Sequence, residues 1–288
     1  MSGSFRNIRH IGDTSGLENV KNKILSIGLR PDGFVFAVLD ADNFQYLKLE
    51  DFQYTSGNNK EDYTLYLNHF LENHMHLKNS VTQIHVSLFT SNLILVPANH
   101  YDVKDKEKLF RFFSGAPEEH IALEDKLNNL DAIGLYCIPI KTKELLDADF
   151  GNYKLRHQGT ALIESILATN KLENRQVDVV LHVKPTFFEI ILMEGEKVCL
   201  YQSFKYQVFD DLMYYLFYAL EQFDKDAAGL KLLLVGETAI DCQPYITLAR
   251  MFDKVLLPER NDAFKYAKGF DQIPGHFYYN LLNFITCG

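Results

Sequence analysis

Arg30 and Lys184 are the residues whose positions first suggest chemistry. Each stands immediately before a proline in a turn, within "LRPDG" (29–33) and "VKPTF" (183–187). Two cationic side chains brought together would bind an anionic ligand or an acidic peptide. The same positions also suit the solvated ends of two hairpins, where charges contribute little. The sequence leaves both interpretations open.

No other group of residues has the spacing of a familiar catalytic or metal site. Four histidines lack the spacing of three or four that one helix face requires: His69, His74, His76 and His85. The sequence contains no Ser, His and acid set and no Walker loop. Four cysteines are far apart and are expected to be reduced thiols: Cys137, Cys199, Cys242 and Cys287. We therefore predict no metal site and name no catalytic residue.

The two turns belong to two stretches with the same predicted order of elements. Short apolar runs with partial period-two alternation predict three strands, followed in both halves by an amphipathic helix and a fourth strand. Residues of the same type coincide when the halves are aligned: Pro31 with Pro185, Phe34 with Phe188, Phe52 with Phe204 and Tyr66 with Tyr215. Length differences fall in loops, which tolerate them. We interpret the pattern as an internal duplication in an α/β protein with mixed sheets, and chance likeness of two meanders as the alternative.

Composition and charge limit the classes of partner. The 288 residues, 47% hydrophobic and 23% charged, indicate a folded globular chain of two domains or one large one. A formal net charge of -9 at pH 7 disfavours nucleic acids and anionic membrane surfaces. No segment reaches about 18 apolar residues, and the start lacks a secretory signal, so we predict a cytoplasmic protein without membrane insertion. Residues 1–20, rich in Ser, Gly and Asn, suggest a flexible leader.

Four stretches carry a resemblance to a known fold: "SIGLRPDGFVFAV" (26–38), "SNLILVP" (91–97), "SFKYQVFDDLMYYL" (203–216) and "LLLVGETA" (232–239). With the repeat, they make the chain similar to the actin-like ATPase clan of actin, sugar kinases, heat-shock ATPases and pilus or secretion assembly proteins. More narrowly, the chain resembles a bacterial domain-of-unknown-function family in that clan. The resemblance implies an α/β, ribonuclease H-like duplicated fold with two lobes, each a mixed sheet flanked by helices. We expect lobe I over residues 21–152 and lobe II over residues 153–288.

The resemblance also implies a place for ATP between the first turns of the two lobes. In actin-like ATPases, backbone N–H groups of small residues in these turns approach the phosphates, and carboxylates hold Mg²⁺. The first turn here has Gly28, Asp32 and Gly33. The second has Thr186 and Phe187, with neither glycine nor acid. A proline without an N–H and a bulky phenylalanine cannot form a close phosphate cradle, so half of the clamp is missing.

Gly236 and Glu237 replace the two glycines that line the adenosine pocket in this fold, although a glycine ending a strand is an equally ordinary reading. The predicted ligand-binding residues of the cleft between the lobes are Gly28, Arg30, Asp32, Gly33, Lys184, Thr186, Gly236 and Glu237.

These observations favour a non-catalytic actin-like scaffold or adaptor with a degenerate nucleotide cleft, a protein partner and no cofactor. Phe187 and Phe188 are expected to fill the place of the phosphates. One alternative is an ATPase or phosphotransferase that binds ATP and Mg²⁺. Another is a sensor of small anions that uses Arg30 and Lys184.

Overall fold

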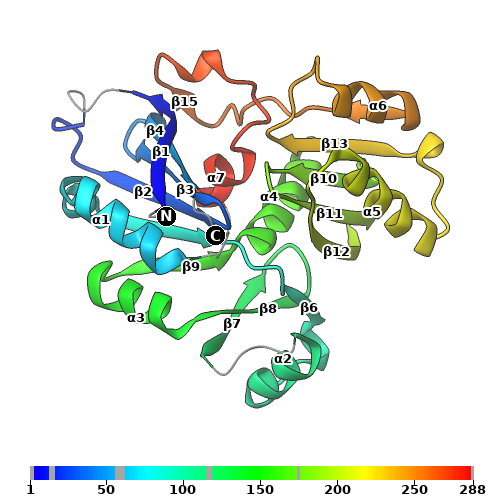
Figure 1. Cartoon of the computed structure of the whole chain (residues 1–288), viewed down its shortest axis with the longest axis horizontal. Helices are drawn as coiled ribbons and strands as arrows, with labels where there is room; N and C mark the ends of the chain where they lie inside the picture. The colour runs from blue at the N-terminus through cyan, green and yellow to red at the C-terminus, as the bar shows by residue number, and fades with distance from the viewer. Residues whose placement is uncertain (1–2, 13–16, 56–61, 115–118, 174–175, 287–288) are drawn as a thin grey trace.

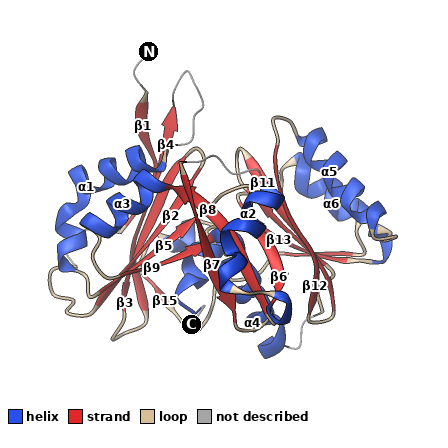
Figure 2. Ribbon diagram, turned by 90° about the horizontal axis from the view of Figure 1, so that it is seen from below, coloured by secondary structure: helices blue, strands red, loops and turns tan. Residues whose placement is uncertain are grey.

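Two large sheets stand side by side in the computed structural model, which describes residues 3–12, 17–55, 62–114, 119–173 and 176–286 (Figure 1). Helices α1 and α3 lie outside the first sheet, and α5 and α6 lie outside the second (Figure 2). Helices α4 (Gln158–Glu173) and α7 (Tyr279–Asn283) lie between the two sheets in Figure 1. The predicted α/β class, with two mixed sheets flanked by helices, is confirmed.

The first sheet has the strand order β1-β4-β3-β2-β5-β9, and β15 pairs with β4. Its strands are β1 (Ser4–Ile11), β2 (Lys23–Arg30), β3 (Gly33–Asp40), β4 (Gln45–Thr55), β5 (Gln83–Leu88), β9 (Tyr153–His157) and β15 (Lys265–Tyr266). Strands β2, β3 and β4 form an antiparallel meander, while β5 and β9 are added in parallel. Every residue of β3 is buried, as expected for a central strand covered on both faces.

The second sheet repeats this arrangement with the order β12-β11-β10-β13-β14. Its strands are β10 (Val179–Val183), β11 (Phe187–Glu194), β12 (Lys197–Lys205), β13 (Lys231–Gly236) and β14 (Lys254–Leu256). The antiparallel and parallel pairs match those of β4-β3-β2-β5-β9. Phe34 pairs with Phe52, and Phe188 pairs with Phe204, with stacked ring centroids 4.9 and 5.4 Å apart. The residues aligned from the sequence therefore occupy corresponding places in the two sheets.

A third, small antiparallel sheet follows β5 in the chain and has the order β6-β8-β7. Its strands are β6 (Ile94–Pro97), β7 (His120–Leu127) and β8 (Ala132–Pro139). The α-helices are α1 (Tyr63–Ser80), α2 (Lys106–Ser114), α3 (Ile140–Asp149), α4 (Gln158–Glu173), α5 (Phe209–Gln222), α6 (Gln243–Met251) and α7 (Tyr279–Asn283). Short 3-10 helices are η2 (Ala98–His100), η3 (Val103–Asp105), η4 (Ala227–Gly229), η5 (Phe270–Gln272) and η6 (Phe284–Thr286). None of the helices in the described ranges has both the length and the apolar content needed to cross a membrane.

Helix α4 shares one hydrophobic cluster with both sheets. Its buried residues Leu162, Ile163 and Ile166 belong to the same hydrophobic cluster as Leu25 of β2 and Val180 of β10. Apolar contacts on several sides explain why this helix is apolar around much of its circumference.

The structure corrects the predicted leader. Residues 4–11 form β1, which pairs antiparallel with β4 and places Phe5 opposite Tyr54, with ring centroids 4.8 Å apart. This strand is stabilised by pairing with β4, which lies about 40 residues further along the chain. Its own composition therefore did not predict a strand. Residues 1–2 and 13–16 lie outside the described residues.

The division into lobes at residues 152 and 153 stays a prediction. Strand β9 begins directly after that boundary but belongs to the first sheet, as does β15 near the C-terminus.

Candidate functional site

Two tight hairpins place the predicted site residues at the junction of the sheets. Arg30 and Gly33 close the β2–β3 turn. In the second hairpin, the Lys184 N–H donates to the Phe187 carbonyl at 2.9 Å, which closes a turn of the same length. Arg30 therefore corresponds to Lys184, as the sequence alignment predicted, and Gly33 corresponds to Phe187.

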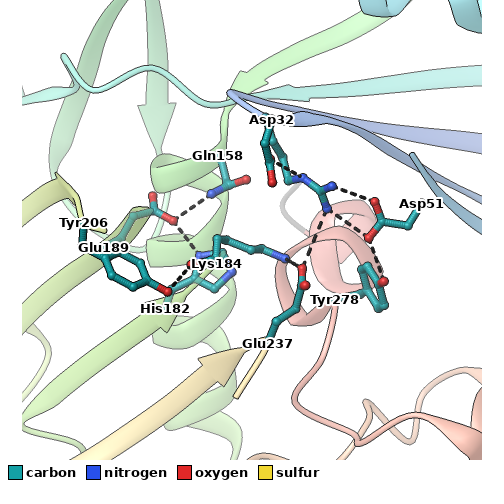
Figure 3. A network of polar contacts seen from close by, with 10 residues as sticks. Asp32, Asp51, Gln158, His182, Lys184, Glu189, Tyr206, Glu237 and Tyr278 are labelled. Carbon is teal, nitrogen blue, oxygen red and sulfur yellow. Dashed lines mark hydrogen bonds and ion pairs between the residues drawn. The ribbon is translucent and has the colours of Figure 1, made fainter. Parts of the chain in front are cut away.

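Arg30 is buried among three carboxylates. They belong to Asp32, Asp51 and Glu237, which are labelled in Figure 3. The Arg30 guanidinium makes a bidentate contact with Asp51, with Nη2–Oδ1 and Nη1–Oδ2 distances of 2.7 and 3.1 Å. Its Nε lies 3.3 Å from Asp32 Oδ1, and its Nη1 lies 3.8 Å from Glu237 Oε1. Burial alone would raise the pKa of Asp51, but attraction and hydrogen bonds from Arg30 hold it below the ordinary value.

Lys184 reaches the same carboxylate from the second hairpin. Its Nζ lies 3.2 Å from Glu237 Oε1 and 5.4 Å from the centre of the Tyr278 ring. The two cationic side chains therefore approach the same carboxylate, Glu237. Both are buried and are paired with carboxylates. Asp32, Asp51 and Glu237 supply three carboxylates for two cations, so the cluster has no excess positive charge to attract an anion.

The glycines of the predicted site are explained by backbone geometry. Gly33 has φ +147°, and a Cβ there would lie 2.0 Å from the Phe52 carbonyl oxygen. Gly236 has φ +96°, and a Cβ there would lie 2.1 Å from the Val183 carbonyl oxygen. Both positions require glycine because any side chain would clash with the neighbouring strand. The presence of glycine at these positions is therefore no evidence for phosphate binding.

A second buried network lies beside the first and was missed by the sequence analysis. Glu189 accepts hydrogen bonds from Gln158 Nε2 at 2.8 Å and from Tyr201 Oη at 2.6 Å, and its Oε2 lies 2.6 Å from His182 Nδ1. Burial would raise the pKa of Glu189, but His182 and Tyr201 lower it below the ordinary value. The sequence feature that could have indicated this network is the single acid, Glu189, inside the apolar run "FFEIILM" (187–193). A charged residue buried in such a strand needs hydrogen-bond partners.

The C-terminal segment closes the junction and was also missed. Tyr278 lies in the left-handed region, with φ 55°, and its hydroxyl donates to Asp51 Oδ2 at 2.7 Å. The His276 carbonyl accepts from the Gly236 N–H at 3.0 Å. Asn280 Nδ2 donates to the Gln158 carbonyl at 2.9 Å. The sequence assigned no role to this segment, because nothing local indicated which surface it would cover.

Aromatic rings occupy part of the junction. Phe187 is fully buried and stacks on Phe89, with ring centroids 3.8 Å apart. The expectation that Phe187 fills the place of the phosphates stays a prediction. Phe188 packs within the second sheet's own core, on Phe204.

The residues at the junction do not fit ATP and Mg²⁺. The cavity between the hairpins has a volume of about 20 Å³, whereas small-molecule sites enclose roughly 300–1,000 Å³. The carboxylates that would ligate Mg²⁺ are paired with Arg30 and Lys184. No group of three metal-ligating side chains occurs in the part of the chain that the structure describes. Thr186 lies in the turn with its buried hydroxyl unpartnered among the described residues.

The paired sheets define an actin-like fold, and comparison with solved structures supports this. A Bacteroides thetaiotaomicron protein with actin-like ATPase fold and unknown function is 20% identical, with a TM-score of 0.70 over 85% of this chain and 94% of that chain. A chain of the PilM-PilN type IV pilus biogenesis complex is 13% identical, with a TM-score of 0.62 over 93% of this chain and 99% of that one.

The particular family follows from the sequence match. A family model described as "Protein of unknown function (DUF3822)" matches residues 13–255. The chain therefore belongs to the DUF3822 family, which confirms the resemblance to a domain-of-unknown-function family with an actin-like fold. Comparison with curated proteins finds no match.

Proposed function

We propose that this protein is a non-catalytic actin-like scaffold or adaptor that binds a protein partner. The observation that carries the proposal is the closed junction between the hairpins. Arg30 and Lys184 converge on Glu237, and a cavity of only about 20 Å³ remains. A nucleotide would have to break several buried ion pairs to enter. Each broken pair would leave a buried charge without its partner, which is energetically unfavourable.

The partner part of the proposal draws on a structural neighbour. A chain with a similar fold has been solved within the PilM-PilN complex, so an actin-like fold of this size can serve in a protein assembly. Cross-linking in the native cells, followed by reconstitution from purified components, tests this part. Reconstitution that yields no measurable complex with any cross-linked protein would contradict it.

The cleft is tested by isothermal titration of the purified protein with Mg-ATP. We expect no heat beyond dilution at millimolar nucleotide. Lys184→Gln is the matched control, because it keeps the hairpin but removes one cation of the junction. Micromolar binding that this substitution abolishes would overturn the proposal and place ATP in the cleft.

The alternative functions predict different results in the same preparation. An ATPase or phosphotransferase would turn over nucleotide and lose that activity on Asp32→Asn. A sensor of small anions would show a thermal shift with inorganic phosphate that Arg30→Met and Lys184→Gln remove. The excess of carboxylates over cations at the junction supports neither outcome.

A further inference from the structure

The small cavity at the junction is lined by polar groups whose hydrogen bonds are incomplete. His182 Nε2 and Asn280 Oδ1 are buried and have no hydrogen-bond partner among the described residues, and both residues line the cavity. Their side chains belong to residues only 1% and 6% exposed. Buried polar atoms in folded proteins are nearly always hydrogen-bonded to protein or to ordered water.

The neighbouring contacts decide that both atoms are acceptors. Asn280 Nδ2 donates to the Gln158 carbonyl at 2.9 Å, which orients the amide and leaves Oδ1 as the acceptor. His182 Nδ1 lies 2.6 Å from Glu189, a carboxylate that also accepts from Gln158 and Tyr201. The imidazole proton therefore sits on Nδ1, and burial lowers the pKa of His182, so neutral Nε2 carries a lone pair.

We propose that this cavity binds one water molecule, which donates one hydrogen bond to His182 Nε2 and the other to Asn280 Oδ1. The cavity has a volume of about 20 Å³, so it has room for an ordered water molecule.

The chemistry of the lining excludes other small ligands. A metal ion lacks ligands here, because no group of three metal-ligating side chains occurs in the part of the chain that the structure describes. A small anion would face two acceptor atoms, and Arg30 and Lys184 are already paired with Asp51 and Glu237. A neutral molecule with two O–H donors satisfies both acceptors.

The water would join β10 of the second sheet, through His182, to α7, through Asn280. Gly28 of β2 and Ser87 of β5, both in the first sheet, also line the cavity. The site therefore lies where both sheets and α7 meet. This inference concerns the cavity alone and does not rest on the proposed function.

The experiment compares crystal structures of the wild-type protein and two variants at a resolution that shows ordered water. A Cβ on Gly28 would lie 3.1 Å from Val35 Cγ1, 3.4 Å from Ser87 Oγ and 3.6 Å from Leu281 Cδ1, all in cavity-lining residues. Gly28→Ala thus places a methyl group in the cavity and should remove the water. Ser87→Ala enlarges the cavity, keeps both acceptors and should retain it.

A ¹⁵N NMR measurement provides a second test, because it reports directly on the protonation and hydrogen bonding of His182 Nε2. The ¹⁵N shift of His182 Nε2 should indicate an unprotonated nitrogen that accepts a hydrogen bond in the wild type and in Ser87→Ala. In Gly28→Ala that hydrogen bond should be lost. Either a wild-type structure with an empty or metal-like density at this place, or a spectrum with the proton on Nε2, would overturn the proposal. The wild-type measurements suffice if Gly28→Ala does not fold.

Discussion

Replacing Asp51 with asparagine tests whether the Arg30 cluster is a structural ion pair. The substitution keeps the shape of the side chain but removes the charge that faces Arg30 through contacts of 2.7 and 3.1 Å. Asp51 is fully buried and Arg30 is 2% exposed, so water cannot replace the lost partner. We expect strong destabilisation from Asp51→Asn and from Arg30→Met.

The magnitude follows from the remaining contacts. Breaking a buried pair costs about 3–5 kcal/mol. Arg30 retains Asp32 at 3.3 Å and Glu237 at 3.8 Å, so Asp51→Asn should fall near the lower end, at about 3 kcal/mol. The double variant, Arg30→Met with Asp51→Leu, replaces the pair by apolar groups but removes a partner from Asp32 and from the Tyr278 hydroxyl, so it should still destabilise the protein, by less than the sum of the two single losses.

Urea unfolding, followed by far-UV circular dichroism and by tyrosine fluorescence, measures these differences, since the chain has 16 Tyr and no Trp. Lys225→Ala is the control, because it removes an exposed pair with Glu194 at 2.6 Å and should leave the midpoint unchanged. Single variants that lose less than about 1 kcal/mol, or a double variant that costs the sum of both, would refute the reasoning.

Two further predictions concern pH and backbone strain. Burial lowers the pKa of His157 to about 4, whereas the unfolded chain protonates near 6.5, so His157 destabilises the protein by about 3 kcal/mol as the pH falls from 6.5 to 4. Unfolding measured across this window should show a shallower loss in His157→Gln, and parallel curves would contradict the assignment. Gly33→Ala should cost more than about 3 kcal/mol, because strain adds to a clash with the Phe52 carbonyl. Gly195→Ala, with φ +64° and open space around it, should cost about 1 kcal/mol, and equal losses in the two alanine variants would argue against the clash.

Local patterns determined the central hairpins. The apolar run "FVFAVLD" (34–40) after a Pro-Asp-Gly turn predicted β3, because turn chemistry and strand patterning depend on adjacent residues. The edge strands β1 and β9 were missed for the opposite reason. Each is paired on only one side within the sheet and is partly exposed, so neither carries a continuous apolar run.

The residues of the candidate site were also predicted only in part. The sequence by itself determined the two proline turns, the equivalence of Arg30 with Lys184, and the bulky Phe187 at the position that corresponds to Gly33. Only the tertiary structure decided what surrounds them: Tyr278 meets Asp51 across 227 positions of the chain, and Lys184 meets Glu237 across 53. Turns and strands follow from dihedral preferences of neighbouring residues, whereas burial and charge pairing depend on which distant surfaces the folded chain brings together.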